Sequence, residues 1–418
     1  MISGLGAVTP LALSAEASWK AILAGESGIG RITQFDPSDL PCQIAGEVKG
    51  FSAKDFMNFK EARRMSRASQ LAVAAGQMAL DDAALSLPLS DPDAVGTVVG
   101  TGMGGIERAY ENWDIYRKKG LSRVNPFSLT SVLPNMPSHH ISLMAGSQGP
   151  ISTVVAACAT GTQAIGEGAE LIRHGRAKVV LAGGVEGLIH EAAIAGFAAM
   201  RALSTAFNDR PEKASRPFDA DRDGFILSEG AGIVVLERLD HALERGAKIY
   251  AEYLGYASSS DAFHVAAPDP EGAGAIRAMS WALEDAGVAL DEVGYINAHG
   301  SSTPINDLIE TQAIKQLFGE EAYNIPVSST KSAMGHAMGG AGAIEAIFCI
   351  FALQQGMLPP TLNFETPDPE CDLDYVPNVS RVADIRVAMS NSFGLGGQNA
   401  CLVLSRYDSN GMPDNDQV

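Results

Sequence analysis

The sequence predicts an α/β protein made of two halves that repeat each other. In the first half a helical pattern ends at residues 78–83 and is followed by an apolar run at 95–100. In the second half, residues 281–286 and 293–297 repeat this order of elements. Short apolar strands that alternate with helices are typical of mostly parallel sheets covered by helices on both faces. We therefore expect two α/β halves related by pseudo-symmetry.

The individual elements follow in chain order. Residues 1–10 have the pattern of a short strand that ends in a glycine-rich turn. Residues 154–161 and 327–332 form a second repeat, because each is a short apolar strand that leads into a helix of small residues. Helices that are apolar on every side belong in a core, so we expect these two to pack against each other or between sheets. A strand is predicted at 177–181, and the glycine-rich segment 391–400 precedes a final strand.

Length and composition agree with two fused globular halves. The chain has 418 residues, of which 46% are hydrophobic and 19% are charged. The predicted units are an N-terminal half at 1–245, a C-terminal half at 246–406 and a polar tail at 407–418. The net charge of −19 disfavours binding to nucleic acid, and any acidic partner protein would need a locally basic patch.

Neither export nor membrane insertion is indicated by the sequence. No uninterrupted apolar run reaches the roughly 18–20 residues of a membrane span, and the N-terminus lacks the pattern of a secretory signal. The five cysteines are scattered without a C-x-x-C spacing, which favours neither disulfides nor a zinc cluster. We therefore expect a cytoplasmic protein that does not associate with a membrane.

Cys158 is the candidate nucleophile. It stands where a predicted buried strand ends and a helix of small residues begins. Free N–H groups and the positive dipole end of a helix N-terminus favour the thiolate, so we expect a lowered pKa for this thiol. The other four cysteines have no such setting and are expected to be structural: Cys42, Cys349, Cys371 and Cys401.

Two histidines lie in loops where functional side chains are common. His299 follows the predicted strand at 293–297, and His336 stands in the turn that enters the second helix of small residues. Taken alone, each is equally compatible with an ordinary loop residue. One cysteine with two histidines also suggests a metal site, but the sequence shows no compact ligand spacing and no obvious acidic fourth ligand. We therefore expect no metal.

Six motifs resemble the β-ketoacyl-acyl-carrier-protein synthase II family, in order and from about Ser3 to Leu404. They are residues 157–161, 216–219, 222–225, 297–300, 331–336 and 391–399. The resemblance implies a thiolase-like fold, with two pseudo-symmetric halves in a five-layered αβαβα arrangement, and a homodimer. It also implies an active site between the halves and no cofactor, because the substrates arrive on the phosphopantetheine arm of acyl carrier protein.

The resemblance also implies a role for each of these residues in a decarboxylating condensation. Cys158 takes the acyl group as a thioester. His299 and His336 stabilise the enolate that forms when malonyl loses carbon dioxide. The backbone amides of Cys158 and Leu395 stabilise the tetrahedral oxyanion.

Further residues match positions that support the site or bind the substrate. Lys331 and Glu345 match an ion pair that orders His336. Leu395 stands at a gate where the family usually has phenylalanine, and Ser301 stands where threonine is more common. The remaining matches are Phe393 at the gate, Met103 and Phe197 in the acyl pocket, and Ser301 with Thr303 along the phosphopantetheine arm.

A locally basic surface is the expected docking site for the carrier protein. Its members match the family's docking residues, except that Ser122 replaces a basic residue that is common beside Arg123. A local field outweighs net charge at contact range, because the Debye length is only about 8 Å at physiological salt. The expected docking residues are Lys60, Arg63, Arg64, Arg123 and Arg201.

Related activities remain as alternatives. A degradative thiolase is disfavoured because the C-terminal glycine loop has no second cysteine. An initiating synthase, which takes acyl-coenzyme A, is disfavoured because such enzymes resemble a Cys-His-Asn pattern, whereas His336 supplies a second histidine here. A non-catalytic partner subunit typically lacks the nucleophile, which is present here as Cys158. A polyketide or nodulation-type ketosynthase shares every residue named above and stays open.

Overall fold

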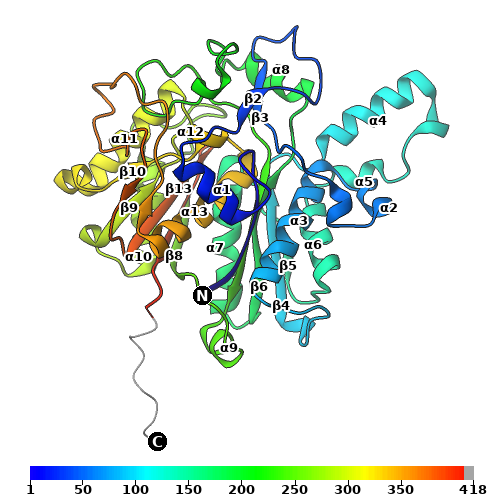
Figure 1. Cartoon of the computed structure of the whole chain (residues 1–418), viewed down its shortest axis with the longest axis horizontal. Coiled ribbons are helices and arrows are strands. Elements are labelled where there is room, and N and C mark those ends of the chain that lie inside the picture. The colour runs from blue at the N-terminus through cyan, green and yellow to red at the C-terminus, as the bar shows by residue number, and fades with distance from the viewer. Residues whose placement is uncertain (409–418) are drawn as a thin grey trace, which may run out of the picture.

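Two five-stranded sheets form the body of the protein in the computed structural model, which describes residues 1–408 (Figure 1). Of the predicted tail, residues 409–418 lie outside the described residues. The first sheet has the order β1-β7-β6-β4-β5 and the second the order β8-β14-β13-β9-β10. The strands of the first sheet are β1 (Ile2–Val8), β4 (Val95–Thr101), β5 (Ile151–Ser152), β6 (Val179–Glu186) and β7 (Gly230–Glu237). Those of the second are β8 (Glu252–Ser260), β9 (Val293–Asn297), β10 (Val327–Ser328), β13 (Val387–Gly394) and β14 (Gln398–Ser405).

The two sheets have equivalent topologies, which confirms the pseudo-symmetric halves. In the first sheet β5, β4 and β6 run parallel while β7 and β1 are antiparallel to their neighbours. The second sheet repeats this with β10, β9 and β13 parallel, and β14 and β8 antiparallel to their neighbours. The sheets are therefore mixed, and the expectation of mostly parallel sheets holds only in part, because two of the four strand pairings in each sheet are antiparallel. A buried strand is apolar in either direction, so its sequence does not reveal that a short turn at 395–397 reverses the chain.

Helices complete the five predicted layers. Between the sheets lie α7 (Thr160–Arg173) and α13 (Ala341–Gln355), each of which contacts strands of both sheets. The outer face of the first sheet is covered by α3 (Arg67–Asp82) and α6 (Met136–Ala145). The second sheet is covered by α10 (Ala273–Ala286), on which α11 (Pro304–Phe318) packs.

The two central helices touch at their small residues, as the second repeat predicts. A Cβ added to Gly161 would lie only 2.6 Å from the backbone nitrogen of Ala343. The segment Met338–Gln355, which contains α13, is long and apolar enough to cross a membrane by length and composition, but 89% of it is buried inside the protein. Its apolarity is therefore explained by its place in the core.

The N-terminal segment differs from its predicted structure. Residues Ile2–Val8 form a single buried strand, β1, without the glycine-rich turn that was expected. A Cβ on Gly4 would lie 2.3 Å from the carbonyl oxygen of Ala79, and one on Gly6 would lie 2.0 Å from that of Ala75. The glycines therefore allow α3 to pack closely on the sheet.

Smaller elements surround this core. Figure 1 shows α4 projecting from the side of the first half. The remaining helices are α1 (Ala15–Leu23), α2 (Phe59–Ala62), α4 (Ile106–Lys119), α5 (Ser128–Val132), α8 (Glu191–Ala199), α9 (Leu239–Glu244) and α12 (Lys331–Met334). The remaining strands are β2 (Ile29–Arg31), β3 (Ile44–Gly46), β11 (Met357–Leu358) and β12 (Arg381–Val382).

Candidate active site

Cys158 lies in a short 3₁₀ turn, η4 (Ala157–Ala159), which leads directly into α7. The preceding residue, Ala157, has a φ of +49°, a left-handed conformation that is costly for a residue with a side chain. The Thr160 hydroxyl holds this turn, because it accepts from the amide of Ala156 at 2.8 Å and donates to the carbonyl of Ala157 at 2.8 Å. The chain thus places Cys158 in a fixed position at the start of a central helix.

His336 is held by the other half of the protein through its main chain. Its amide donates to the carbonyl of Ile226 at 2.7 Å, and its carbonyl accepts from the amide of Ser228 at 3.0 Å. Gly335 allows the approach, since its φ of +75° is a conformation that glycine adopts readily. The position of the His336 ring therefore depends on contacts between the two halves.

His299 is fixed at the end of β9 by a carboxylate that sequence reasoning did not identify. Glu310, on α11, accepts hydrogen bonds from the amides of His299 and Gly300, both at 2.8 Å. Glu310 is fully buried, and burial raises its pKa to about 7. The sequence offers no clear signal for Glu310, because polar residues are spread along α11 and do not show which face of the helix is buried.

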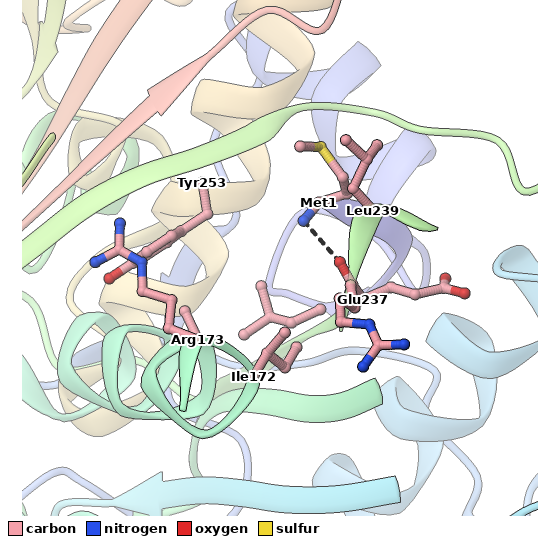
Figure 2. Close-up of a pocket in the computed structure, with 9 residues that line it drawn as sticks. Met1, Ile172, Arg173, Glu237, Leu239 and Tyr253 are labelled. Atoms are coloured by element: carbon pink, nitrogen blue, oxygen red, sulfur yellow. Dashed lines mark hydrogen bonds between the residues drawn. The ribbon is translucent and has the colours of Figure 1, made fainter. Parts of the chain in front are cut away.

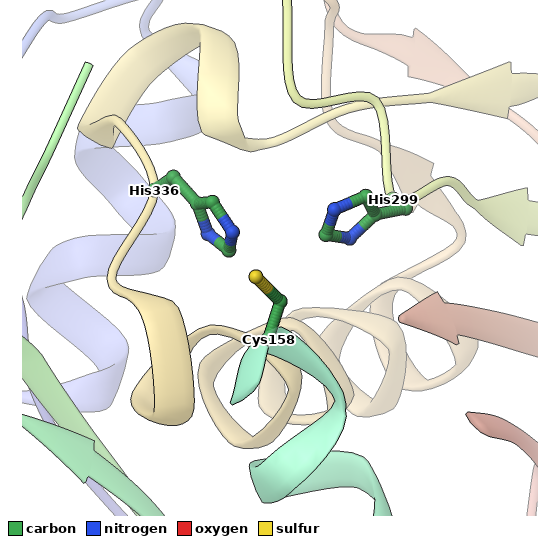
Figure 3. Close-up of side chains that lie close together, drawn as sticks. All are labelled: Cys158, His299 and His336. Carbon is green, nitrogen blue, oxygen red and sulfur yellow. The ribbon is translucent and has the colours of Figure 1, made fainter. Parts of the chain in front are cut away.

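The three predicted side chains converge between the halves (Figure 3). The sulfur of Cys158 and one nitrogen each of His299 and His336 all lie within 4.8 Å of one another. The two imidazole rings are 5.2 Å apart at their centroids and nearly perpendicular, at 81°. All three residues are at least 95% buried, so their chemistry takes place away from bulk water.

Burial keeps both histidines neutral. It lowers the pKa of His299 well below its usual value, and the positive charge of Lys331 and the neighbouring His336 add to the effect. Burial and Lys331 lower the pKa of His336 in the same way. Neutral imidazoles can each donate one hydrogen bond and accept another, which suits them to hold a developing oxyanion.

The expected lowering of the Cys158 pKa was wrong. Burial raises the pKa of this thiol to about 11, and the carboxylates of Glu186 and Glu345 act in the same direction. The backbone amide of Leu395 and the charge of Lys331 oppose this shift but do not overcome it. A helix N-terminus favours the thiolate, but the loss of hydration in the closed site favours the neutral thiol and has the larger effect.

Lys331 and Glu345 form a buried ion pair beside the histidines. The Lys331 ammonium donates to a carboxylate oxygen of Glu345, and both side chains are almost completely inaccessible. Of the two charges, that of Lys331 acts on the histidines, and it lowers the pKa of both.

The predicted gate and pocket residues differ in exposure, and ring contacts relate two of them to the histidines. Leu395 and Phe393 are half-buried, and the Phe393 ring lies 6.0 Å from the His299 ring. Phe197 packs edge-on against Phe225, whose ring is in turn 5.6 Å from His336. Met103 is 40% exposed.

Ser301 and Thr303 come together in the loop after β9. Their hydroxyl oxygens are 3.0 Å apart. The Thr303 hydroxyl also accepts from the amide of Asn306 at 3.3 Å, so Thr303 caps the N-terminus of α11. The two hydroxyls are thus held in place by the helix that also supplies Glu310.

The predicted docking residues are all exposed but do not form one cluster. Lys60, Arg63 and Arg64 lie on or directly after α2, and the Arg64 guanidinium stacks 4.5 Å from the Phe127 ring. Arg123 lies in a 3₁₀ turn beyond the end of α4, and Arg201 follows α8. Figure 1 shows α2 and α8 on separate parts of the surface.

A separate hollow of about 320 Å³ lies at the opposite end of α7 from Cys158. Figure 2 shows Arg173, Tyr253 and Met1 around it, with the Met1 amino group donating to the carbonyl of Glu237 at 2.8 Å. The predicted site residues do not line this hollow. It therefore has no part in the chemistry of Cys158.

Comparisons with known proteins agree with this site. Beta-ketoacyl synthase family models match residues 1–242 (N-terminal domain) and residues 250–365 (C-terminal domain). The 3-oxoacyl-[acyl-carrier-protein] synthase 2 of Synechocystis sp. is 49% identical over 407 residues, covering 97% of this chain and 98% of that protein.

Solved structures show the same fold. A β-ketoacyl synthase from Burkholderia phymatum is similar with a TM-score of 0.91 and 36% identity, over 97% of this chain and 99% of that chain. A type II polyketide acyl-carrier protein in complex with its ketosynthase gives a TM-score of 0.90 at 32% identity, with 97% and 98% covered. The thiolase-like fold predicted from the sequence is thereby confirmed, and the chain belongs to the β-ketoacyl synthase family.

Proposed function

We propose that this protein elongates acyl chains in fatty-acid synthesis, by decarboxylating condensation of an acyl-enzyme thioester with malonyl-acyl-carrier-protein. The observation that carries the proposal is the convergence of one buried thiol and two neutral imidazoles between the halves. The 49% identical relative named 3-oxoacyl-[acyl-carrier-protein] synthase 2 supports fatty-acid elongation over polyketide synthesis, for which the similar structure is 32% identical.

In the first step Cys158 attacks the acyl thioester. Because burial raises its pKa to about 11, the thiol gives up its proton as the S–C bond forms. A neutral imidazole in the cluster takes this proton and passes it to the departing carrier thiolate. The backbone amide of Leu395, which faces the sulfur, stabilises the tetrahedral oxyanion together with the Cys158 amide.

In the second step malonyl thioester replaces the departed carrier. His299 and His336 donate hydrogen bonds to the malonyl thioester oxygen, the C–C bond to the carboxylate breaks, and carbon dioxide leaves. The resulting enolate carbon attacks the acyl carbonyl, which forms the new C–C bond and releases the Cys158 thiolate. The thiolate takes up a proton from solvent once the site opens, which replaces the proton that left with the first carrier thiol, and the β-ketoacyl product leaves on its carrier.

The carrier protein and the substrate arm have defined sites in this proposal. The exposed cations Lys60, Arg63 and Arg64 attract an acidic carrier surface although the whole chain carries −19. Ser301 and Thr303 bind the phosphopantetheine arm, and Met103 and Phe197 line the acyl pocket. No cofactor or metal takes part, since every step uses side chains and main-chain amides of the site.

A second copy of the chain is the proposed partner in a homodimer. Five apolar side chains on or next to α4, α5, α6 and β5 are 54–81% exposed: Trp113, Leu121, Leu129, Leu143 and Ile151. Strand β5 is also an edge strand of the first sheet. Open strand edges with exposed apolar side chains around them are often covered in an assembly. Light scattering should show a dimer that Leu143→Asp dissociates, while Val382→Asp, at a site 78% exposed on β12, leaves it intact.

The cysteines support a reducing compartment, and we assign the protein to the cytoplasm on that basis. All five are free, and all five are buried. Reducing compartments keep thiols in this state. Localisation of the tagged full chain in fractionated cells tests the assignment, and recovery from an oxidising compartment contradicts it.

Reconstitution with purified substrates tests the proposed reaction. The wild type, given acyl-carrier protein and malonyl-carrier protein, should form β-ketoacyl-carrier protein with release of one carbon dioxide per product. Cys158→Ala should form no product but should still release carbon dioxide from malonyl thioester, because both histidines remain. Condensation that continues in Cys158→Ala rejects the proposed function.

A further inference from the structure

Glu186 is a buried carboxyl that the steps above do not use. It ends β6 and is completely inaccessible. One carboxylate oxygen accepts from the Thr101 hydroxyl at 3.1 Å. The other accepts from the amides of Gly102 at 3.0 Å and Gly339 at 3.3 Å. A single side chain thus connects the turn after β4 with a segment of the C-terminal half.

The turn after β4 carries Met103, the proposed wall of the acyl pocket. The Thr101 hydroxyl that donates to Glu186 also accepts from the amide of Gly104 at 3.1 Å. Glu186 therefore anchors both ends of the three-residue segment 102–104, directly at Gly102 and through Thr101 at Gly104. A Cβ on Gly102 would lie 2.8 Å from the Glu186 carboxylate, so a larger residue at this position would push the carboxylate away from its hydrogen-bond donors.

The opposite side of Glu186 faces the segment after His336. Gly339, three residues beyond His336, lies in the turn η8 (Met338–Gly340) that leads into α13. A Cβ added to Gly339 would lie 2.4 Å from the nitrogen of Gly102, so the two backbones touch here. The charge of Glu186 also acts on the nucleophile, because it adds to the effect of burial in raising the pKa of Cys158.

We propose that Glu186 is a positioning residue that holds the Met103 turn against the segment after His336 and thereby sets the acyl-chain selectivity of the enzyme. The inference rests on the proposed function, which places Met103 in the acyl pocket. Without the carboxylate, the amide of Gly102 and the hydroxyl of Thr101 lose their acceptor, and the turn gains freedom to move Met103. The pocket then fits short and long acyl chains in a different ratio.

Two nearly isosteric variants test this role from both ends of the hydrogen bond. Glu186→Gln keeps the size of the side chain but replaces one acceptor oxygen by a donor. Thr101→Val removes only the hydroxyl and leaves the contact between Glu186 and Gly339 intact. Glu111→Gln is the matched control, because this glutamate is half-exposed on α4 and its partner within residues 1–408 is Arg108 at the surface.

The measurement is the rate of acyl transfer to Cys158 from octanoyl- and palmitoyl-carrier protein, with malonyl decarboxylation followed in the same preparations. We expect the octanoyl-to-palmitoyl ratio to change by about tenfold, in the same direction, in Glu186→Gln and Thr101→Val. Decarboxylation by Thr101→Val and all rates of Glu111→Gln should stay within about twofold of the wild type. A ratio that is unchanged in both variants overturns the inference, as does a parallel loss of all three rates.

The pH dependence of the same ratio separates positioning from general structural support. Burial raises the pKa of Glu186 to about 7, against the opposing effect of the amides of Gly339 and Gly102. The titratable groups around Glu186 do not change charge between about pH 6 and about pH 8, since burial raises the pKa of Cys158 to about 11 and lowers that of His336 well below 6.5. The other groups that face Glu186 are the Thr101 hydroxyl at the end of β4 and main-chain amides, including that of Gly339 in η8. The wild-type ratio should therefore change between about pH 6 and about pH 8, and the Glu186→Gln ratio should not.

The outcomes for Glu186 and for the proposed function are distinguishable. A wild type that transfers no acyl group to Cys158 refutes the proposed function. A wild type that is acylated normally, with variants that keep its ratio and its pH dependence, refutes only the role of Glu186.

Discussion

His336→Ala separates the two half-reactions of the proposed mechanism. The substitution removes one of two imidazole donors from the malonyl oxyanion, and the loss of one such donor costs about 2.7–4 kcal/mol, or about 10²–10³ in rate. His336 is a neutral donor because burial and Lys331 lower its pKa, so we expect the lower end of this range, about 10². The main-chain bonds from His336 to Ile226 and Ser228 do not depend on the side chain, and the fold should persist.

The assay measures carbon dioxide release from malonyl-carrier protein and, separately, acylation of Cys158 by acyl-carrier protein. Decarboxylation should fall by about 10², while acylation falls by less than about tenfold. His336→Asn restores an N–H donor to the same place and should recover part of the decarboxylation rate. Equal losses in both half-reactions would refute the reasoning, because His336 would then act on the thiol or on the structure.

Three other perturbations give independent results. The rate of Cys158 alkylation by iodoacetamide should rise about tenfold per pH unit from about pH 6 to about pH 9. The reason is that burial raises the pKa of the Cys158 thiol to about 11 and only the thiolate reacts. A rate that reaches a plateau below about pH 8 contradicts this prediction. Reversing Arg63 and Arg64 to Glu should raise KM for carrier protein by about tenfold and leave small thioester mimics unaffected; an unchanged KM places docking elsewhere. Leu395→Phe should narrow the range of acyl chains accepted, because a larger ring closes the gate more completely, and identical profiles from short to very long chains would reject a role in selectivity.

The sequence predicted the halves and the reacting side chains for physical reasons that can be named. Apolar runs such as 95–100 and 293–297 became β4 and β9, because a buried strand needs apolar residues on both faces. Small residues around Gly161 and Ala343 predicted that two central helices are in contact, because small side chains let the backbones approach closely. Cys158, His299 and His336 stood in motifs whose residues and order along the chain resembled one family.

The remaining features depend on contacts between distant segments. Whether a strand is parallel or antiparallel follows from its neighbours, so the mixed sheets were missed. The pKa of Cys158 depends on how completely the site buries the thiol. The sequence showed that Cys158 stands at the start of a helix, but it did not show how deeply the side chain is buried. Glu186 and Glu310 were missed because their buried carboxylates bind main-chain amides, and any residue type can supply such an amide.

Trapping the acyl group on the enzyme tests whether Cys158 carries the acyl chain during condensation. Wild-type protein is mixed with acyl-carrier protein without malonyl substrate, digested, and analysed by mass spectrometry of all five cysteine-containing regions. We expect one acyl group per chain, on Cys158 alone, which disappears when malonyl-carrier protein is added and β-ketoacyl product forms. An acyl group on another residue, or product formation without any acylation of Cys158, would contradict this expectation.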